Sequence, residues 1–172
     1  MKIKMFGNKS LSMLLFYVTK IAAIGYSLFL AFILLSLVTK SFIKNEEGAF
    51  IIKIPFTDSV IKGAFDIKTI VAIILFLLFY ISFFYLLSLI FKTFKAETLF
   101  SMIAIRHLTY FTWFNLILPF LYVILQVIIL SKVSFSELSG AFLHIVIGIF
   151  AAFIASIFKQ GVEIQEENEL TI

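Results

Sequence analysis

Four long apolar runs divide the chain, and shorter polar segments separate them. The runs extend over about residues 11–38, 70–91, 108–130 and 138–158. A helix rises 1.5 Å per residue, so it needs about 20 apolar residues to cross a hydrocarbon core of roughly 30 Å. Each run reaches that length. The pattern therefore predicts an all-α fold, an integral membrane bundle of four transmembrane helices within a single membrane domain, residues 1–172.

The longest polar segment, residues 39–69, is expected to be a small extracytoplasmic loop or hairpin. Residues 49–54 are rich in β-branched and aromatic side chains, residues 55–58 have the composition of a turn, and residues 60–67 are semi-apolar. This pattern predicts a two-stranded hairpin, with an irregular loop as the alternative. A lone hairpin is marginal in water, so it should rest on the helix ends or on the lipid surface.

Composition excludes a soluble fold. Hydrophobic residues make up 62% of the 172 residues, and the mean hydropathy is +1.14, whereas soluble domains are about 45–50% apolar. A chain of this size has no core large enough to bury so much apolar surface, so the lipid bilayer is the expected partner. The chain has no cysteine, which excludes disulfides and thiol chemistry. The net charge of +4 is small, so direct nucleic-acid binding is not expected.

The distribution of basic residues predicts the orientation. Lys2, Lys4 and Lys9 precede the first run, Lys92, Lys95 and Arg106 lie between the second and third runs, and Lys132 stands alone between the third and fourth. The segment 39–69 mixes five lysines with four acidic residues. Cytoplasmic loops are enriched in lysine and arginine, so we expect both termini in the cytoplasm. The first run is interpreted as an uncleaved signal-anchor helix, with a cleaved signal peptide as the alternative.

Polar residues of the third run share one face. Thr112, Asn115, Pro119, Tyr122 and Gln126 are separated by 3, 4, 3 and 4 positions, a spacing that places them on one stripe of a helix. An unpaired polar group in hydrocarbon costs several kcal/mol, so the stripe should face the bundle interior.

The fourth run carries a matching stripe of mostly small residues. Gly140, His144, Gly148, Ala151 and Ala155 are separated by 4, 4, 3 and 4 positions. Small residues let another helix approach closely, either within one chain or between two, so a homo-oligomer remains open.

The short link between the third and fourth runs predicts an antiparallel pair. Reflection through the middle of that link places His144 level with Gln126, with Tyr122 one turn deeper. The candidate intramembrane polar cluster is therefore Asn115, Tyr122, Gln126 and His144. Three interpretations stay open: hydrogen bonds that hold helices together, a proton- or ligand-sensing site, and a transport path.

No catalytic constellation emerges from the sequence. HExxH, GxSxG and phosphate-loop motifs are absent, and no aspartate or glutamate falls within the four runs. One histidine with neutral amide and phenol neighbours is too little for a metal site. We therefore expect a non-enzymatic protein without catalytic, cofactor-binding or metal-binding residues.

The chain ends in a short acidic tail, residues 159–172, which is too polar to enter a bilayer. The tail resembles the end of a bacterial membrane family known as domain of unknown function 2975. Members are short four-span proteins that end in a segment like Phe-x-x-Gly-x-x-Leu-Gln-Glu-Glu-x-Asp-Leu-Thr-Ile. The matching positions here are Phe158, Gly161, Ile164, Gln165, Glu166, Glu167, Glu169, Leu170, Thr171 and Ile172, with isoleucine and glutamate replacing leucine and aspartate at 164 and 169.

The resemblance implies a bacterial inner-membrane protein. Such proteins are often encoded beside a small helix-turn-helix regulator, which implies a cytosolic DNA-binding partner. The candidate partner-binding tail comprises Gly161, Gln165, Glu166, Glu167, Glu169, Leu170, Thr171 and Ile172. The charged side chains of this tail are all negative, so they could attract a basic protein. The alternative is that the tail is only a solvated end of the last helix. The sequence thus favours a sensor or anchor that acts with a regulator. A small transporter or toxin-immunity membrane protein is the alternative.

Overall fold

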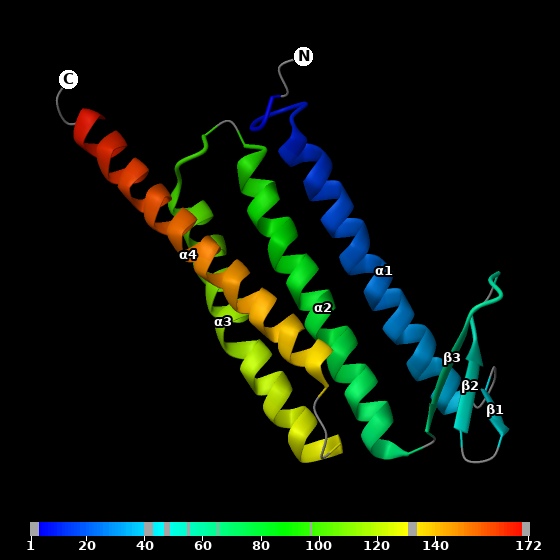
Figure 1. The fold of residues 1–172 in the computed structure, drawn as a ribbon. Helices are drawn as coiled ribbons and strands as arrows, with labels where there is room; N and C mark the ends of the chain where they lie inside the picture. The colour runs from blue at the N-terminus through cyan, green and yellow to red at the C-terminus, as the bar shows by residue number, and fades with distance from the viewer. Residues whose placement is uncertain are drawn as a thin grey trace.

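The computed structural model describes residues 4–39, 43–46, 49–54, 56–64, 66–96, 98–130 and 134–169. Its helices are α1 (Leu11–Thr39), α2 (Ile67–Phe94), α3 (Met102–Leu130) and α4 (Phe135–Glu169) (Figure 1). All four are long and apolar enough to cross a membrane. The predicted all-α, four-span membrane fold is confirmed, and the chain is a multi-pass membrane protein.

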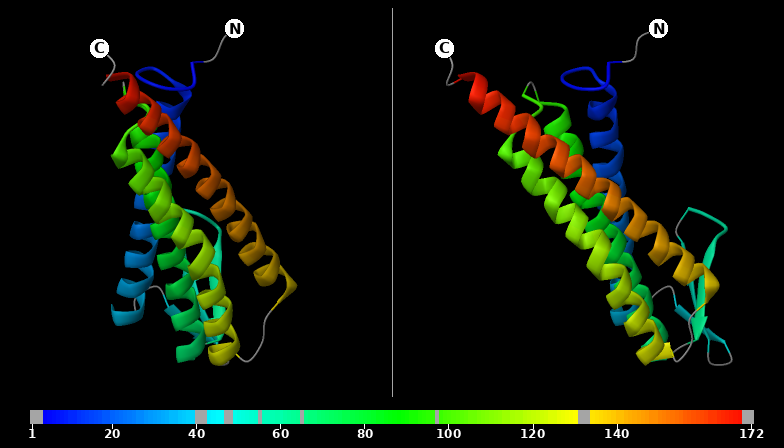
Figure 2. Two further views of the ribbon diagram at one scale, coloured as in Figure 1. Left: turned by 90° about the vertical axis from the view of Figure 1, so that its left-hand side faces the viewer. Right: turned by 60° about the vertical axis from the view of Figure 1, so that its left-hand side comes forward.

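The helices lie side by side in chain order. α1 packs along α2, α2 packs on α3, and α3 packs on α4. The start of α1 and the end of α4 lie at one end of the molecule, which we call the terminal end (Figures 1 and 2). A small β-sheet lies at the opposite end, which we call the sheet end. The two termini therefore share a side, as the basic residues predict, and the identity of that side stays a prediction.

The sheet has three antiparallel strands in the order β1 (Ile43–Glu46), β2 (Ala49–Lys53) and β3 (Val60–Ala64). The predicted hairpin corresponds to β2 and β3, and β1 is a further strand that the sequence analysis did not predict. Phe50 and Ile52 of β2 are 2% and 0% exposed. Both face Ile33 of α1 and Ile70 of α2 across a narrow gap. The sheet thus rests on helix ends, because its apolar face needs cover.

Gly63 of β3 makes room for that apolar face. It stands opposite Phe50 in the register of β2 and β3. A Cβ atom at position 63 would lie 2.7 Å from the Phe50 ring, closer than real contacts allow. The Phe50 ring can therefore cross β3 only because residue 63 has no side chain.

Polar side chains mark where two of the helices begin. Asp66 is the N-cap of α2, and its carboxylate accepts hydrogen bonds from the Thr69 backbone N–H and hydroxyl, both at 2.9 Å. These bonds, the backbone one first, hold the pKa of Asp66 below its ordinary value. At the start of α3, Ser101 Oγ accepts from the Ala104 N–H at 3.2 Å. Each cap satisfies an N–H that the first helical turn leaves without a carbonyl.

The apolar core lies between α2, α3 and α4 toward the terminal end. Its buried members are Ile90, Ala104, Leu108, Phe111, Ala151 and Phe158. The polar stripe of α3 continues from this core toward the sheet end. The core therefore fixes α3 against α4 and positions the polar residues beyond it.

The acidic segment after Phe158 is a continuation of α4. The fourth predicted span ends at 158, whereas the helix runs on to Glu169. Its 35 residues extend about 52 Å, well beyond a hydrocarbon core of roughly 30 Å. Its last turns project past the other helices at the terminal end (Figures 1 and 2). Leu170, Thr171 and Ile172 lie outside the described residues.

Candidate functional site

A hydrogen bond joins α3 and α4 within the membrane-spanning region. His144 Nδ1 and Asn115 Oδ1 are 2.9 Å apart, and the two residues are 8% and 0% exposed. Asn115 Nδ2 donates to the Phe111 carbonyl at 2.8 Å. The amide oxygen is therefore the atom that faces His144, and His144 Nδ1 must be the donor. In the neutral imidazole this leaves Nε2 as an acceptor.

The prediction that His144 lies level with Gln126 is wrong. The reflection assumed that both helices turn back around the middle of their link. In the structure α3 runs on past the start of α4 toward the sheet end (Figure 1). This shift moves the partner of His144 from position 126 to position 115, about three helical turns along α3.

Gly148 fixes this register. A Cβ atom at position 148 would lie 3.1 Å from Asn115 Cβ and 3.1 Å from Leu116 Cδ2. α3 and α4 therefore approach each other closely beside the His144–Asn115 bond, as expected for a small residue between membrane helices. The predicted stripe of small residues does face α3 at this point.

The rest of the predicted cluster forms a second pair. Gln126 Nε2 donates to the Tyr122 hydroxyl at 2.6 Å, one turn apart on α3. Among the described residues, Gln126 Oε1 is buried without a hydrogen-bond partner. The structure thus divides the four candidates into Asn115–His144 between helices and Tyr122–Gln126 within one helix.

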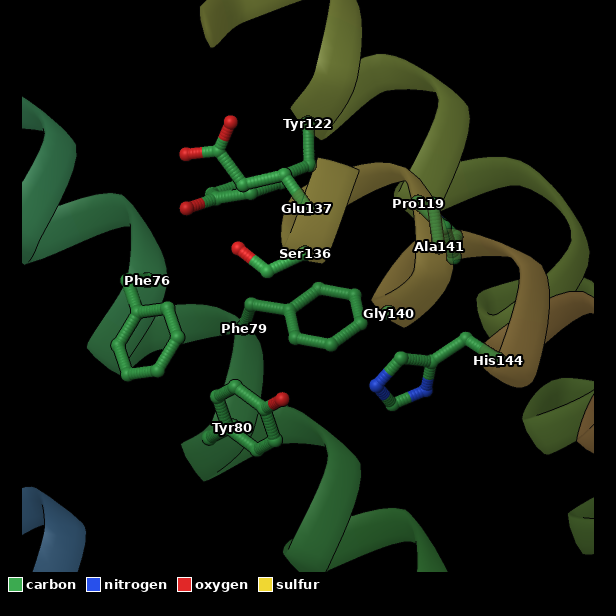
Figure 3. Close-up of a pocket in the computed structure, with 10 residues that line it drawn as sticks. All are labelled: Phe76, Phe79, Tyr80, Pro119, Tyr122, Ser136, Glu137, Gly140, Ala141 and His144. Atoms are coloured by element: carbon green, nitrogen blue, oxygen red, sulfur yellow. The ribbon is translucent and has the colours of Figure 1, made fainter. Parts of the chain in front are cut away.

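A cavity of about 200 Å³ lies beside these pairs, toward the sheet end. Its wall consists of Phe76, Phe79 and Tyr80 from α2, Pro119 and Tyr122 from α3, and Ser136, Glu137, Gly140, Ala141 and His144 from α4 (Figure 3). The His144 ring stands edge-on to Phe79 and Phe83, with centroids 4.8 and 5.0 Å away. These aromatic contacts hold the imidazole in one orientation.

The cavity combines an aromatic wall with a few polar groups. Figure 3 shows the His144 ring and the Tyr80 hydroxyl pointing toward each other across it, with Ser136, Glu137 and Tyr122 at its far side. With Nδ1 bound to Asn115, His144 presents Nε2 to the cavity as an acceptor. Apolar walls with a small number of placed polar groups are typical of sites for small amphipathic molecules.

Glu137 is a cavity residue that the sequence analysis missed. The predicted fourth span began at Leu138, whereas α4 begins at Phe135. Glu137 Oε2 accepts from the Ser134 N–H at 2.7 Å, and the Glu137 N–H donates to Ser134 Oγ at 3.3 Å. This reciprocal arrangement is a capping box, and the spacing Ser-x-x-Glu was visible in the sequence.

The described residues contain no group of three histidine, cysteine, aspartate or glutamate side chains that could hold a metal ion. The Glu137 carboxylate is directed to the start of its own helix, and His144 Nδ1 is directed to an amide. The arrangement therefore supports hydrogen bonding to a ligand. Within the described residues, no histidine is hydrogen-bonded to a nucleophilic side chain such as a serine or threonine hydroxyl.

A family model described as Protein of unknown function (DUF2975) matches residues 5–172. The chain belongs to this family. A search of curated proteins and a search of solved structures each found no match. The membership confirms the resemblance that the tail indicated, and it assigns the DUF2975 chain no activity.

The first part of the tail motif packs α4 against the connection between α2 and α3 in this DUF2975 protein. Phe158 stacks on Phe94 at 5.4 Å and meets Phe100 edge-on at 5.2 Å. A Cβ atom at Gly161 would lie 2.5 Å from the Phe100 ring, so this approach requires glycine. Phe158 and Gly161 therefore have a packing role that the motif alone did not reveal.

The acidic part of the motif points away from the bundle. Gln165, Glu166, Glu167 and Glu169 are all exposed on the last turns of α4. Lys159 and Glu163 lie one turn earlier and form an ion pair at 3.9 Å. The structure thus presents the candidate tail as an exposed acidic helix end.

Proposed function

We propose that this protein is a non-enzymatic sensor of the bacterial inner membrane. In this proposal the cavity receives a small amphipathic molecule, and the acidic end of α4 holds or releases a cytosolic regulator. The observation that carries the proposal is the continuity of α4. One unbroken helix places His144 in the cavity near its start and exposed carboxylates at its end.

An unbroken helix is a suitable coupling element because it moves as a rigid unit. A ligand that displaces the start of α4 would shift Gly148 against Asn115 and Gly161 against Phe100, the two glycine positions of α4 where an added Cβ would be crowded. Tight contacts of this kind convert a small displacement into a change of packing. A ligand that binds better to one packing arrangement would thereby change the position of the acidic end.

The packing of α3 against α4, which we call the α3–α4 seam, favours sensing over transport. A transporter needs a path from the cavity to the opposite side of the membrane. Beyond His144 the α3–α4 seam narrows at Gly148, where a Cβ would lie only 3.1 Å from Asn115 and Leu116, and then meets the apolar core around Leu108 and Ala151. This packing supports a cavity that ends at His144.

The proposed partner is a small basic DNA-binding protein in the cytoplasm. The orientation rests on the basic residues at the terminal end, and the class of partner rests on the family resemblance. Exposed glutamates at the end of α4 would compete with DNA phosphates for the same basic surface. A helix C-terminus adds a partial negative charge, which strengthens the attraction.

The experiment is a pull-down from native membranes with three forms of the chain. These are the full chain, the chain without Gly161–Ile172, and the variant Glu166→Gln/Glu167→Gln. A matched control, Glu166→Asp/Glu167→Asp, keeps both charges. We expect a cytosolic DNA-binding protein to bind the full chain and the aspartate variant and to be lost from the other two. Recovery of the same cytosolic proteins with the truncated chain would overturn the proposed role of the tail.

The sensing step has a separate test. Ala141→Phe places a ring in the cavity, whereas the matched control Leu138→Phe places one on an exposed surface of the same helix, where Leu138 is 51% exposed. We expect the first variant to change retention of the regulator by the full-length chain and the second to leave it unchanged. Equal retention by both variants would separate the cavity from the tail and refute the coupling.

A further inference from the structure

A second hollow lies between α1 and α2, on the side of α2 away from the site described above. It is a groove of about 570 Å³ whose apolar wall includes Ala23, Ile24 and Leu28 of α1 and Ile81 and Leu89 of α2. Between positions 16 and 28 the groove follows α1 for about 18 Å. That is more than half the thickness of a hydrocarbon core of roughly 30 Å.

Two lysines stand at the terminal end of this groove. Lys20 of α1 and Lys92 of α2 both line it, and both are exposed. A third, Lys95, lies over the Phe16 ring at 4.0 Å, next to Lys20 at 5.6 Å from the same ring. Within the described part of the chain, neither Lys20 nor Lys92 forms an ion pair. Lysines inside apolar helices are costly, so their convergence at one groove indicates an anionic ligand.

The two serines that line the groove below the lysines leave its apolar surface largely intact. Ser27 Oγ donates to the Ala23 carbonyl at 2.8 Å, and Ser88 Oγ donates to the Tyr85 carbonyl at 2.7 Å. Both hydroxyls are thus directed to the backbone of their own helix. What remains is a charged end and a channel that is apolar apart from the Tyr85 hydroxyl.

We propose that this groove binds one acidic phospholipid. Its phosphate lies between Lys20 and Lys92, and one acyl chain follows the channel between α1 and α2. Charge complementarity at the terminal end and apolar surface along the channel match the two parts of such a lipid. A soluble anion would use the lysines and leave the channel without a partner. A second copy of this face would bring the same positive charges together.

The test uses the purified full-length chain in nanodiscs of phosphatidylcholine with a fraction of phosphatidylglycerol. Binding of a spin-labelled or photoreactive phosphatidylglycerol is compared with that of the matching phosphatidylcholine. The variants are Lys20→Gln/Lys92→Gln and Ala23→Trp, which blocks the channel. The matched control is Lys53→Gln/Lys62→Gln, which removes the same charge from the exposed face of the sheet.

Two lysines close to an anionic headgroup together contribute on the order of 30-fold in affinity. We expect the Lys20→Gln/Lys92→Gln variant to lose about that much preference for phosphatidylglycerol and the sheet control to keep it. Ala23→Trp should weaken binding of both lipids, since it fills the channel. Unchanged binding in Ala23→Trp, or equal loss in both charge variants, would overturn the proposal. Full competition by soluble glycerol phosphate would do so too.

Folding of each variant is checked by circular dichroism and by elution as a single species. If Lys20→Gln/Lys92→Gln does not fold, the single variants Lys20→Gln and Lys92→Gln replace it. Each should lose about fivefold in preference for phosphatidylglycerol, and unchanged preference in both would overturn the phosphate site.

Discussion

His144 donates a hydrogen bond to Asn115 across the seam between α3 and α4, and both side chains are buried. Asn115 in turn donates to the Phe111 carbonyl of its own helix. The two residues thereby satisfy each other and fix the orientation of the imidazole toward the cavity. Removing either one alone leaves a buried polar atom without a partner, which is costlier than removing both.

A double-mutant cycle tests this pair. Asn115→Leu and His144→Phe replace each side chain by an apolar group of similar shape. We expect each single change to destabilise the chain by about 1–3 kcal/mol, and the double variant to recover part of that loss. The coupling should be about 0.6–1.7 kcal/mol, the range of hydrogen bonds between membrane helices. The measurement is reversible unfolding of the full chain in mixed micelles.

The control cycle pairs His144→Phe with Gln126→Leu. Gln126 is bonded to Tyr122 within α3, so no coupling is expected with position 144. Strong coupling between 144 and 126, together with none between 144 and 115, would contradict the observed register.

Glycine substitutions on α4 test the seam independently. Gly148→Ala adds a Cβ at 3.1 Å from Asn115 Cβ, whereas Gly140→Ala adds one with nothing within 4 Å. Overpacking costs about 1–3 kcal/mol and the better helix propensity of alanine offsets about 0.5–1 kcal/mol of it, so Gly148→Ala should destabilise the chain by up to about 2 kcal/mol. Gly140→Ala should stabilise it by about 0.5–1 kcal/mol, since glycine weakens a helix interior. Equal effects of the two changes on the unfolding free energy would mean that the helices do not approach closely at Gly148.

The sequence predicts the four spans and their inward faces because lipid imposes strong rules. A span must be long, apolar and hydrogen-bonded within itself, and polar groups must turn inward. Asn115 and His144 were identified as inward residues by these rules alone. Their pairing was not, because the register of two helices depends on where their closest contact lies, and here the contact at Gly148 sets it.

At the sheet end, the sequence predicts two of the three strands and misses the other. β2 and β3 have a clear pattern of β-branched and aromatic residues, so the sequence predicts them. The Ile-Lys-Asn-Glu sequence of β1 pairs with β2 through its backbone, and backbone pairing leaves little trace in side-chain pattern. Glu137 was missed for a different reason, because a capping box extends a helix beyond its apolar run.

The N-cap of α2 predicts a dependence on pH. Hydrogen bonds from Thr69 lower the pKa of Asp66 in the folded chain, so its ionised form stabilises the start of α2. That contribution is complete above the ordinary carboxyl pKa of about 3.9, and it is lost as the pH falls through the lower pKa of the folded chain. We expect amide exchange at Thr69 and Ile70, corrected for the intrinsic rate, to increase below about pH 4.

Two variants distinguish the effect of the Asp66 cap on amide exchange from the effect of low pH on the rest of the chain. Asp66→Asn keeps a side-chain acceptor for the Thr69 N–H and should remove the pH dependence while retaining most of the protection. Asp66→Ala should lose the protection at every pH. A pH dependence that persists in Asp66→Asn would have to come from another group.

The contact of Gly161 with Phe100 gives the last prediction, which concerns the acidic end of α4. Gly161→Ala places a Cβ at 2.5 Å from the Phe100 ring, so the packing between the end of α4 and the Phe100 ring must shift. Overpacking of about 1–3 kcal/mol corresponds to roughly a fivefold to 150-fold change in the local opening equilibrium. Hydrogen exchange over residues 158–169 should therefore accelerate by that factor. Phe100→Ala in the same chain removes the obstacle but also the Phe158–Phe100 contact, so it should restore only part of the slower exchange.

Gly25→Ala is the matched control, since nothing lies within 4 Å of a Cβ at that position, and it should leave exchange in α4 unchanged. If α4 is the coupling element, Gly161→Ala should also change retention of the regulator, and the added Phe100→Ala should reverse part of that change. Faster exchange without any change in retention would place the coupling elsewhere, because the acidic end would then bind its partner regardless of how α4 is held.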